Sequence, residues 1–176
     1  MEAVKKLNML ANLMQKRISG NEENLSIVYQ IKGSEGEEIA ENLKIWYNDM
    51  LTRLGEEDIY RGITSVGPHR DDIVVSVNGI NLRSFGSQGQ QRTGVLSMKL
   101  SELEFIRSET GEYPILLLDD VMSELDAGRR QQLLSFIDRE GIQTLITATD
   151  EAYFSHQGMD KYFSVQAGSV TGVSRV

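Results

Sequence analysis

The sequence has no cysteine among its 176 residues, and only two prolines and one tryptophan. Without cysteine it can form neither a disulfide nor a thiolate zinc site. No apolar run approaches the roughly 20 residues that a membrane-spanning helix needs. The first residues, MEAVKKLNML, also lack the long apolar segment of a signal peptide. These absences favour a protein of the reducing cytoplasm that is held together by an apolar core.

The composition is that of a globular chain with an acidic surface. Apolar residues make up 40% of the sequence and charged residues 25%, and the net charge is −8 with a pI near 4.8. Such a balance argues against a protein that coats nucleic acid with a basic surface everywhere. A local basic patch remains compatible with it.

The first 55 or so residues predict a helix, a strand and a second helix. Apolar spacing predicts a helix over 4–18 that stops at Gly20, a strand over 25–31, and a helix over 39–54 that ends at Gly55. Three elements of this size are too few to close a core of their own. We therefore expect this segment to be an appendage that packs on another part of the protein.

The residue pattern of the sequence changes after Arg61, where strand-like runs become frequent. Asn78-Gly79 separates two such runs and predicts a hairpin, because both residues accept positive φ. Four further elements are expected: a strand at 115–118 buried on both faces, a helix between Asp126 and Gly141, a strand at 142–150 and a final strand at 161–170. Helices that alternate with buried strands predict a parallel or mixed α/β sheet.

The stretch SFGSQGQQR, beginning at Ser84, allows two interpretations. Ser87 and Gln90 form an S-x-x-Q capping box, which is a common helix start. Gly86 and Gly89 also remove side chains on both sides of the serine, and free amides at a helix start beside a small hydroxyl can bind an anion. Both interpretations remain open from the residues alone.

Two adjacent carboxylates, Asp119 and Asp120, end the apolar run PILLL. Ligands of α/β sheets collect at the carboxyl ends of strands. One carboxylate there can hold Mg²⁺, and its neighbour can orient a water for attack on a phosphate. A strand that simply ends in a polar turn explains the pair equally well. The local sequence around Asp126 predicts that it caps a helix.

The order of these pieces resembles the C-terminal half of an ABC-type ATPase head, in the form found in SMC-like DNA repair ATPases. FGSQGQQR is similar to the signature motif, ILLLDD to a Walker B strand, SELD to the D-loop, and IQTLITATD to the strand before the switch loop. GITSVGPHRDD and LLLDDVMSELD resemble bacterial recombination mediators within that superfamily. The resemblance covers Arg61 to about Asp150 well and the first 55 residues more loosely.

This resemblance implies an α/β fold, namely the C-terminal lobe of an ABC-type ATPase head with a P-loop NTPase-like mixed sheet. Residues 1–55 would be part of a helical arm. Residues 56–176 would be the half of the head that carries the signature motif, Walker B, the D-loop and the switch strand.

The resemblance also assigns roles to single residues. Asp119 would hold Mg²⁺, and Asp120 would be the catalytic base where most such heads have glutamate. Ser87 and the Gly89 amide would contact the γ-phosphate of an ATP held by a second head. The remaining implied positions are Gln88, Gln90, Gln91 and Arg92 at the dimer face, Asp126 in the loop that crosses between heads, and Thr149 in place of a switch histidine.

The implied function is that of an ATP-switched DNA repair protein. ATP would join two heads into a homodimer that closes on DNA, and hydrolysis would release them. By resemblance the protein would be nucleoid-associated and would help to load recombinase at gapped DNA or at junctions of single- and double-stranded DNA. Its partners would be RecR- and RecO-like mediators. ATP and Mg²⁺ would be its cofactors.

No G-x-x-x-x-G-K-[ST] phosphate loop occurs in the 176 residues. In the family pattern that loop precedes the arm, so we expect the chain alone to lack the usual ATP pocket and to be inactive. Two alternatives stay open: an inert module that docks partners or DNA, and an unrelated metal-dependent hydrolase.

Two other motif matches fail on spacing. HRDD, which begins at His69, is similar to a kinase catalytic loop, but Ser76 stands where that loop needs asparagine. We expect His69 and Arg70 to serve a turn or an ion pair. Val121 likewise interrupts any D-x-D phosphatase motif that begins at Asp119.

Overall fold

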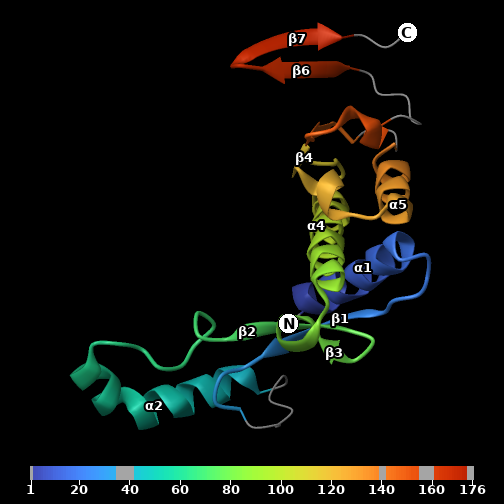
Figure 1. The fold of residues 1–176 in the computed structure, drawn as a ribbon. Coiled ribbons are helices and arrows are strands. Elements are labelled where there is room, and N and C mark those ends of the chain that lie inside the picture. Colours follow the sequence, from blue (N-terminus) through green and yellow to red (C-terminus); the bar gives the residue numbers. More distant parts are fainter. Residues whose placement is uncertain (1, 35–41, 139–141, 155–160, 174–176) are drawn as a thin grey trace. The chain divides into compact units, whose positions relative to one another are not determined.

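The structure is a computed structural model that divides into two compact units, Met1–Pro114 and Ile115–Val176 (Figure 1). Each unit is described by itself. The description covers all residues except 1, 35–41, 139–141, 155–160 and 174–176. The predicted helix stop at Gly141 and the predicted helix start at Ile39 lie outside the described residues.

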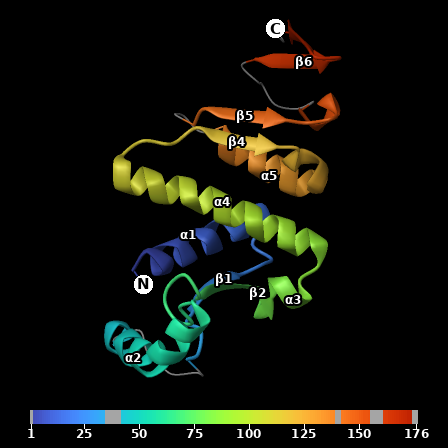
Figure 2. The ribbon, with the colours of Figure 1, turned by 90° about the vertical axis from the view of Figure 1, so that its left-hand side faces the viewer.

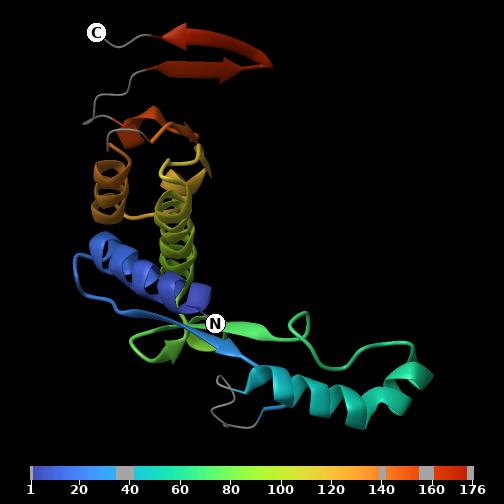
Figure 3. The ribbon, with the colours of Figure 1, turned by 180° about the vertical axis from the view of Figure 1, so that it is seen from behind.

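The first unit combines a three-stranded sheet with helices. Its elements are α1 (Glu2–Ile18), β1 (Leu25–Gln30), α2 (Leu43–Arg61), β2 (Asp72–Val77), β3 (Ile80–Asn81), α3 (Leu82–Phe85) and α4 (Gln88–Thr110). The strands are antiparallel in the order β1-β2-β3. Figures 1 and 3 show β1 and β2 side by side, with α1 lying across α4.

The core of this unit lies where α1 meets the sheet. It is formed by Ala11 of α1, Leu25 and Ile27 of β1, Val77 of β2, and Leu82 of α3. Leu25 pairs with Val77 across the two strands, so both side chains belong to the same face of the sheet. The predicted helix and strand thus pack on later parts of the chain, as expected for a segment without a core of its own.

Polar side chains of α1 fix its position on its neighbours. The backbone amides of Leu25 and Ile27 donate to Asn12 and Asn8, at 3.0 and 2.7 Å. Gln15 is fully buried and accepts a hydrogen bond of 2.7 Å from Ser97 of α4. These contacts satisfy buried polar groups that would otherwise destabilise the packing.

The second predicted helix is longer than its sequence pattern indicated. α2 runs through Gly55 and ends at Arg61, so the predicted stop at Gly55 is wrong. Gly62 is the actual C-cap: it has a φ of 64°, and its amide donates to Asp58 and Ile59. A left-handed C-cap favours glycine, whereas Gly55 keeps helical geometry in the helix interior.

The Asn78-Gly79 hairpin is confirmed. Both residues have positive φ, 50° and 79°, and the hairpin joins β2 to β3. The second strand-like run is shorter than the sequence suggested, because α3 begins at Leu82. Asn81 accepts a hydrogen bond from the Ser84 amide and so starts this short helix.

The second unit contains a parallel pair of strands with a helix on one side (Figure 2). Its elements are β4 (Leu116–Asp119), the 3₁₀ turn η2 (Val121–Glu124), α5 (Ala127–Ile137), β5 (Thr144–Thr147), the 3₁₀ turn η3 (Glu151–Phe154), β6 (Tyr162–Gln166) and β7 (Ser169–Val173). β4 and β5 are parallel, and their register places Asp119 opposite Thr147. The predicted parallel arrangement is therefore confirmed.

The strand β4 is buried on one face only, so the prediction of burial on both faces is wrong. Leu116 and Leu118 are buried, whereas Leu117 is 70% exposed and Ile115 is 58% exposed. Leu145, which pairs with Leu117, is 54% exposed. A continuous apolar run could not reveal this, because each residue of the run is compatible with burial.

The final predicted strand is instead a hairpin. β6 and β7 pair antiparallel, and Ala167 and Gly168 form the turn with φ of 48° and 78°. Alanine is not a typical turn residue, although Ala167 has a left-handed backbone here. The sequence pattern therefore predicted one continuous strand.

The packing boundary lies at Pro114. The predicted division at residue 55 concerns an arm and a head, and it stays a prediction. Among the helices that the structure describes, none is long and apolar enough to cross a membrane.

Candidate functional site

Ser87 begins α4 as its N-cap. Its hydroxyl accepts a hydrogen bond from the Gln90 amide at 3.2 Å, and the Gln90 side chain accepts one from the Ser87 amide at 3.1 Å. Both halves of the predicted capping box are therefore present. Ser87 itself is exposed, so its hydroxyl lies at the surface.

The residues around Ser87 are fixed by backbone contacts. A Cβ on Gly86 would lie 2.7 Å from the carbonyl oxygen of Leu82, so only glycine fits there. Gln91 donates through Nε2 to the carbonyls of Leu82 (2.8 Å) and Gly86 (3.2 Å). Gln91 thus supports the turn before α4, which the sequence did not indicate.

The other residues expected near this helix start are close in sequence and differ in exposure. Gln88 and Gly89 are exposed in the first turn of α4, while Arg92 is half-buried. The Gly89 carbonyl accepts a hydrogen bond from Thr93 at 2.8 Å. The helix start therefore offers a small exposed hydroxyl together with exposed first-turn residues.

Asp119 and Asp120 lie at the carboxyl end of β4, as predicted. The Thr147 hydroxyl, on the neighbouring strand β5, donates to Oδ1 of Asp119. The Asp120 amide donates to that same hydroxyl at 3.0 Å and to the Thr147 carbonyl at 3.2 Å. A single threonine therefore contacts both members of the acidic pair.

Asp120 adopts a left-handed backbone conformation, with φ of 50° and ψ of 21°. Aspartate tolerates this region better than most residues. The Asp120 carbonyl accepts a hydrogen bond from the Ser123 hydroxyl at 2.9 Å, which holds the turn into η2. The chain thus turns sharply directly after the strand, and the two carboxylates do not follow the alternation of a strand.

Thr147 was missed by sequence reasoning. The resemblance directed attention to Thr149, which lies exposed in the bend after β5. A signal was present: polar residues at the carboxyl ends of adjacent parallel strands meet at one edge. Placing Thr147 opposite Asp119 required the strand register, which the sequence does not contain.

Asp126 is the N-cap of α5. Its Oδ1 accepts a hydrogen bond from the Arg129 amide at 2.9 Å, and Oδ2 lies 3.4 Å from Nε of Arg129. The local interpretation of Asp126 as a helix cap is therefore confirmed. Its expected place in a loop between two heads stays a prediction.

The donor set at Asp119 suits Mg²⁺. Mg²⁺ prefers oxygen ligands and is typically held by one or two carboxylates together with waters and substrate phosphates. Asp119 presents such a carboxylate at an exposed strand end, with one oxygen oriented by Thr147. Within the described residues, no group of three or more His, Asp or Glu side chains forms a complete metal cage.

A second polar cluster lies in the first unit, around Asp71. Tyr29 of β1 and Tyr47 of α2 both donate to Oδ2 of Asp71, and the Lys32 amide donates to Oδ1 at 3.0 Å. Desolvation alone would raise the pKa of Asp71, but the hydrogen bonds from the two tyrosines and Lys32, with the nearby His69, lower it overall. Burial and the Asp71 carboxylate raise the pKa of Tyr47.

His69 and Arg70 take part in the turn before β2. Nε of Arg70 donates to the Thr64 carbonyl at 2.8 Å, and the Arg70 amide donates to the Gly67 carbonyl at 2.8 Å. A Cβ on Gly67 would lie 2.9 Å from the His69 ring. The expected turn role is therefore observed, and HRDD forms no catalytic arrangement in the described structure.

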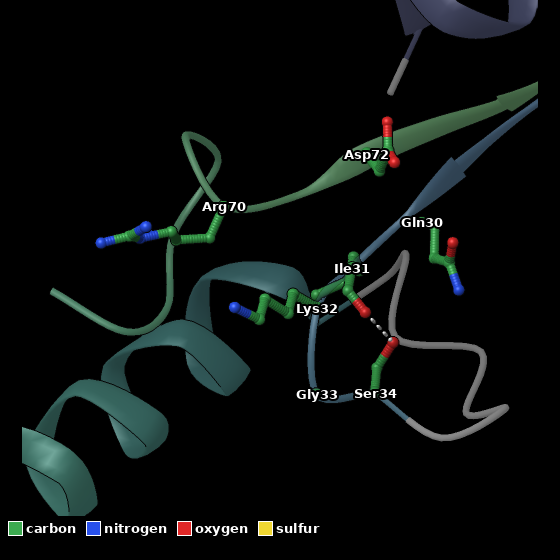
Figure 4. A pocket seen from close by; sticks show the side chains of 7 residues that line it. All are labelled: Gln30, Ile31, Lys32, Gly33, Ser34, Arg70 and Asp72. Atoms are coloured by element: carbon green, nitrogen blue, oxygen red, sulfur yellow. Dashed lines mark hydrogen bonds between the residues drawn. The ribbon is translucent and has the colours of Figure 1, made fainter.

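A hollow of about 420 Å³ lies near this turn, where β1 ends and β2 begins, and residues 30–34 with Arg70 and Asp72 line it (Figure 4). Figure 4 shows the side chains of Lys32 and Arg70 pointing away from Gln30 and Asp72. The bond drawn inside it joins the Ser34 hydroxyl to the Ile31 carbonyl at 2.9 Å. None of the predicted site residues lines this hollow, so we assign it no role.

The predicted site residues fall into two groups. The group from Ser87 to Arg92 belongs to the first unit, whereas Asp119, Asp120, Asp126 and Thr149 belong to the second. The structure brings Asp119 and Asp120 together through Thr147, and it joins Ser87 to Gln90.

Comparison with known proteins finds relatives of one name over most of the chain. The chain is 44% identical over 176 residues to the DNA replication and repair protein RecF of Halothermothrix orenii, covering 97% of this chain and 46% of that protein. It is 46% identical over 161 residues to RecF of Geobacillus kaustophilus, covering 89% and 43%. A solved structure described as the recombination mediator protein RecF-ATP in the RecFOR pathway matches with a TM-score of 0.74 and 35% identity, over 98% of this chain and 45% of that one.

The chain matches the C-terminal half of RecF. It spans slightly less than half the length of the curated RecF proteins that it matches. A scan of protein-family models finds no match. A structure from a study of ATP-driven dimerisation in SMC ATPases matches with a TM-score of 0.59 at 12% identity, which supports the ABC-type head fold alone.

Proposed function

We propose that this RecF segment is the C-terminal part of an ATP-switched DNA-binding protein of repair and recombination. The observation that carries the proposal is the acidic pair Asp119 and Asp120, which lies at the end of a parallel strand and is contacted by Thr147. A RecF relative that is 44% identical to this chain, and a RecF-ATP structure that is 35% identical with a TM-score of 0.74, support the proposal.

The proposed roles follow the geometry of each group. Asp119 would hold Mg²⁺, which would neutralise charge on the phosphates of ATP. Asp120 would accept a proton from the attacking water. Its side chain is one methylene shorter than the glutamate of most ABC heads, so we expect slow hydrolysis.

The exposed start of α4 would serve a second head. Ser87 and the Gly89 amide would contact the γ-phosphate of an ATP bound by the partner, because a helix start favours an anion. For Ser87 to do so, its hydroxyl proton, which points to Oε1 of Gln90 at 3.2 Å, would turn to the phosphate, while the hydroxyl oxygen could still accept from the Gln90 amide. The dimer face would also include Gln88, Gln90 and Arg92, and Asp126 and Thr149 would lie near the nucleotide.

In the complete protein, ATP would join two copies on gapped DNA, and RecR and RecO would be partners in loading recombinase. This would take place in the cytoplasm, at the nucleoid. DNA contacts would be made mainly to phosphates, so affinity should fall with rising salt. The net charge of −8 belongs to this chain alone, so a basic DNA-binding surface would be a local patch on it or would be contributed by the other half of the protein.

The test joins this chain to the N-terminal part of a RecF relative. We expect the completed protein to bind a fluorescent ATP analogue in the presence of Mg²⁺ and to double its mass in light scattering when ATP is added. A completed, folded protein that binds no ATP would contradict the proposal.

A second proposal concerns the chain by itself. Because its 176 residues contain no phosphate loop, the isolated chain would act as a docking module that does not hydrolyse ATP. Divalent-dependent hydrolysis by this chain alone would refute that role and favour a metal-dependent hydrolase.

A further inference from the structure

The Thr147 hydroxyl occupies a defined place between two groups of the acidic pair. The Asp120 amide can only donate, and it donates to this hydroxyl at 3.0 Å. Oδ1 of Asp119 accepts, so the single hydroxyl proton of Thr147 points to it. The direction of both hydrogen bonds is therefore fixed by the chemistry of the partners.

This arrangement gives the two carboxylate oxygens of Asp119 different surroundings. Oδ1 is taken by Thr147, while Oδ2 has no hydrogen-bond partner among the described residues. One carboxylate oxygen is thereby held in place and the other stays available to a cation or to its water. Because β4 and β5 are paired at this position, the hydroxyl and the carboxylate are carried by two hydrogen-bonded strands and not by a loop.

We propose that Thr147 is a positioning residue that orients Asp119 toward Mg²⁺ through its side-chain hydroxyl. The inference rests on the proposed function of this site and adds to it a residue of the segment IQTLITATD to which the resemblance assigned no role. Partners that orient a metal-binding carboxylate typically change metal affinity 10- to 100-fold when they are removed. The contact to the Asp120 amide extends the same effect to the turn that carries the proposed base.

A positioning role can be separated from a structural one because the three residues are exposed. Asp119, Asp120 and Thr147 all lie at the surface of the second unit. Exposed hydrogen bonds of this kind contribute little to folding, so removing the hydroxyl should shift the Tm by less than about 2 °C. A large loss of metal affinity without such a shift would point to orientation.

The chain offers a matched control on the same strand. The Thr144 hydroxyl is buried and has no hydrogen-bond partner within the described part of the chain. Thr144→Val and Thr147→Val therefore make the same isosteric change three residues apart. Only the second removes a hydrogen bond to the acidic pair.

The experiment uses the completed protein with a non-hydrolysable ATP analogue and Mn²⁺ as the paramagnetic probe. Electron paramagnetic resonance measures Mn²⁺ affinity, and light scattering measures the Mg²⁺ concentration that gives half-maximal dimer. We expect Thr147→Val to weaken both about 10- to 100-fold, and Thr147→Ser, which keeps the hydroxyl, to stay within about 3-fold of wild type. Thr144→Val should match wild type.

The outcomes distinguish this inference from the proposed function. If wild type binds Mn²⁺ and the nucleotide while Thr147→Val binds Mn²⁺ equally well, the role of Thr147 is refuted and the proposed function stands. A Thr147→Ser variant as impaired as Thr147→Val would also refute it, because the hydroxyl would then not matter. If folded wild type binds neither ligand, both the proposed function and this inference fail.

Discussion

Asp71 should be the main polar link between α2 and the sheet of the first unit. It accepts hydrogen bonds from Tyr29 at 2.5 Å, from Tyr47, and from the Lys32 amide at 3.0 Å. The perturbation is Asp71→Ala, which leaves two tyrosine hydroxyls and one amide without this partner. α2 contributes no fully buried residue, so apolar packing cannot replace the lost link.

The magnitude follows from the number and kind of these bonds. A hydrogen bond to a charged group contributes about 1.5–3 kcal/mol, and half-burial favours the lower end of that range. The two hydroxyls share one oxygen, so their contributions do not simply add. We expect Asp71→Ala to lower the free energy of unfolding by about 2–3 kcal/mol, and Tyr47→Phe to lower it by about 1 kcal/mol.

The dependence on pH has a definite sign. The pKa of Asp71 is lowered in the folded state, so its contribution is present above the unfolded pKa near 4 and is lost as the pH falls further. The pKa of Tyr47 is raised, so its contribution is present below the unfolded pKa near 10 and is lost as the pH rises. Asp71→Ala should reduce the acid-side dependence, whereas the lowered pKa of Asp58, caused by hydrogen bonds from Ser65, leaves a part of it.

The assay is urea unfolding followed by tryptophan fluorescence. Trp46 is the only tryptophan, and its ring lies 5.2 Å from the ring of Tyr47, so it reports on this link. The neighbouring Asp72→Ala is the control, because exposed Asp72 contacts Arg83 at 3.4 Å and should cost less than about 0.5 kcal/mol. Equal stability of Asp71→Ala and Asp72→Ala would show that Asp71 is not the main polar link between α2 and the sheet.

Three further predictions concern single positions. Gly55→Ala should stabilise α2 by about 1 kcal/mol, whereas Gly62→Ala should destabilise it by about 1 kcal/mol, because of the two glycines only Gly62 has a left-handed backbone. Thermal unfolding should therefore show a higher Tm for the first variant and a lower Tm for the second. Thr144→Val should leave the free energy of unfolding unchanged or raise it by about 1 kcal/mol, since it removes a buried hydroxyl without a partner in the described structure; a clear loss in urea unfolding would disprove this. Asp120→Asn in the completed protein should slow ATP hydrolysis and prolong the ATP-bound dimer in light scattering, and unchanged turnover would exclude Asp120 as the base.

The sequence predicted the elements whose signals are local. The capping box at Ser87, the cap at Asp126 and the Asn78-Gly79 hairpin each depend on residues within a few positions, and all three are present. The sequence is sufficient to predict these features, because the groups that form each hydrogen bond or turn lie within a few residues of one another.

The features that the sequence did not predict depend on distant pairings. Thr147 meets Asp119 only because β4 and β5 are paired in one register, and Tyr29 and Tyr47 come from different elements to the same oxygen of Asp71. The exposure of Leu117 was missed because the hydrophobicity of a residue shows that it can be buried, but does not show whether another element covers it. In each case the missing information is the identity of the partner.

Ser87 is proposed to contact a nucleotide bound by another copy of the protein. The most direct test is light scattering of the completed protein with and without ATP, for wild type and Ser87→Arg, alongside nucleotide binding. We expect wild type to dimerise with ATP, whereas Ser87→Arg should bind ATP with equal affinity and stay monomeric. Equal ATP-dependent dimerisation of the two proteins would contradict it.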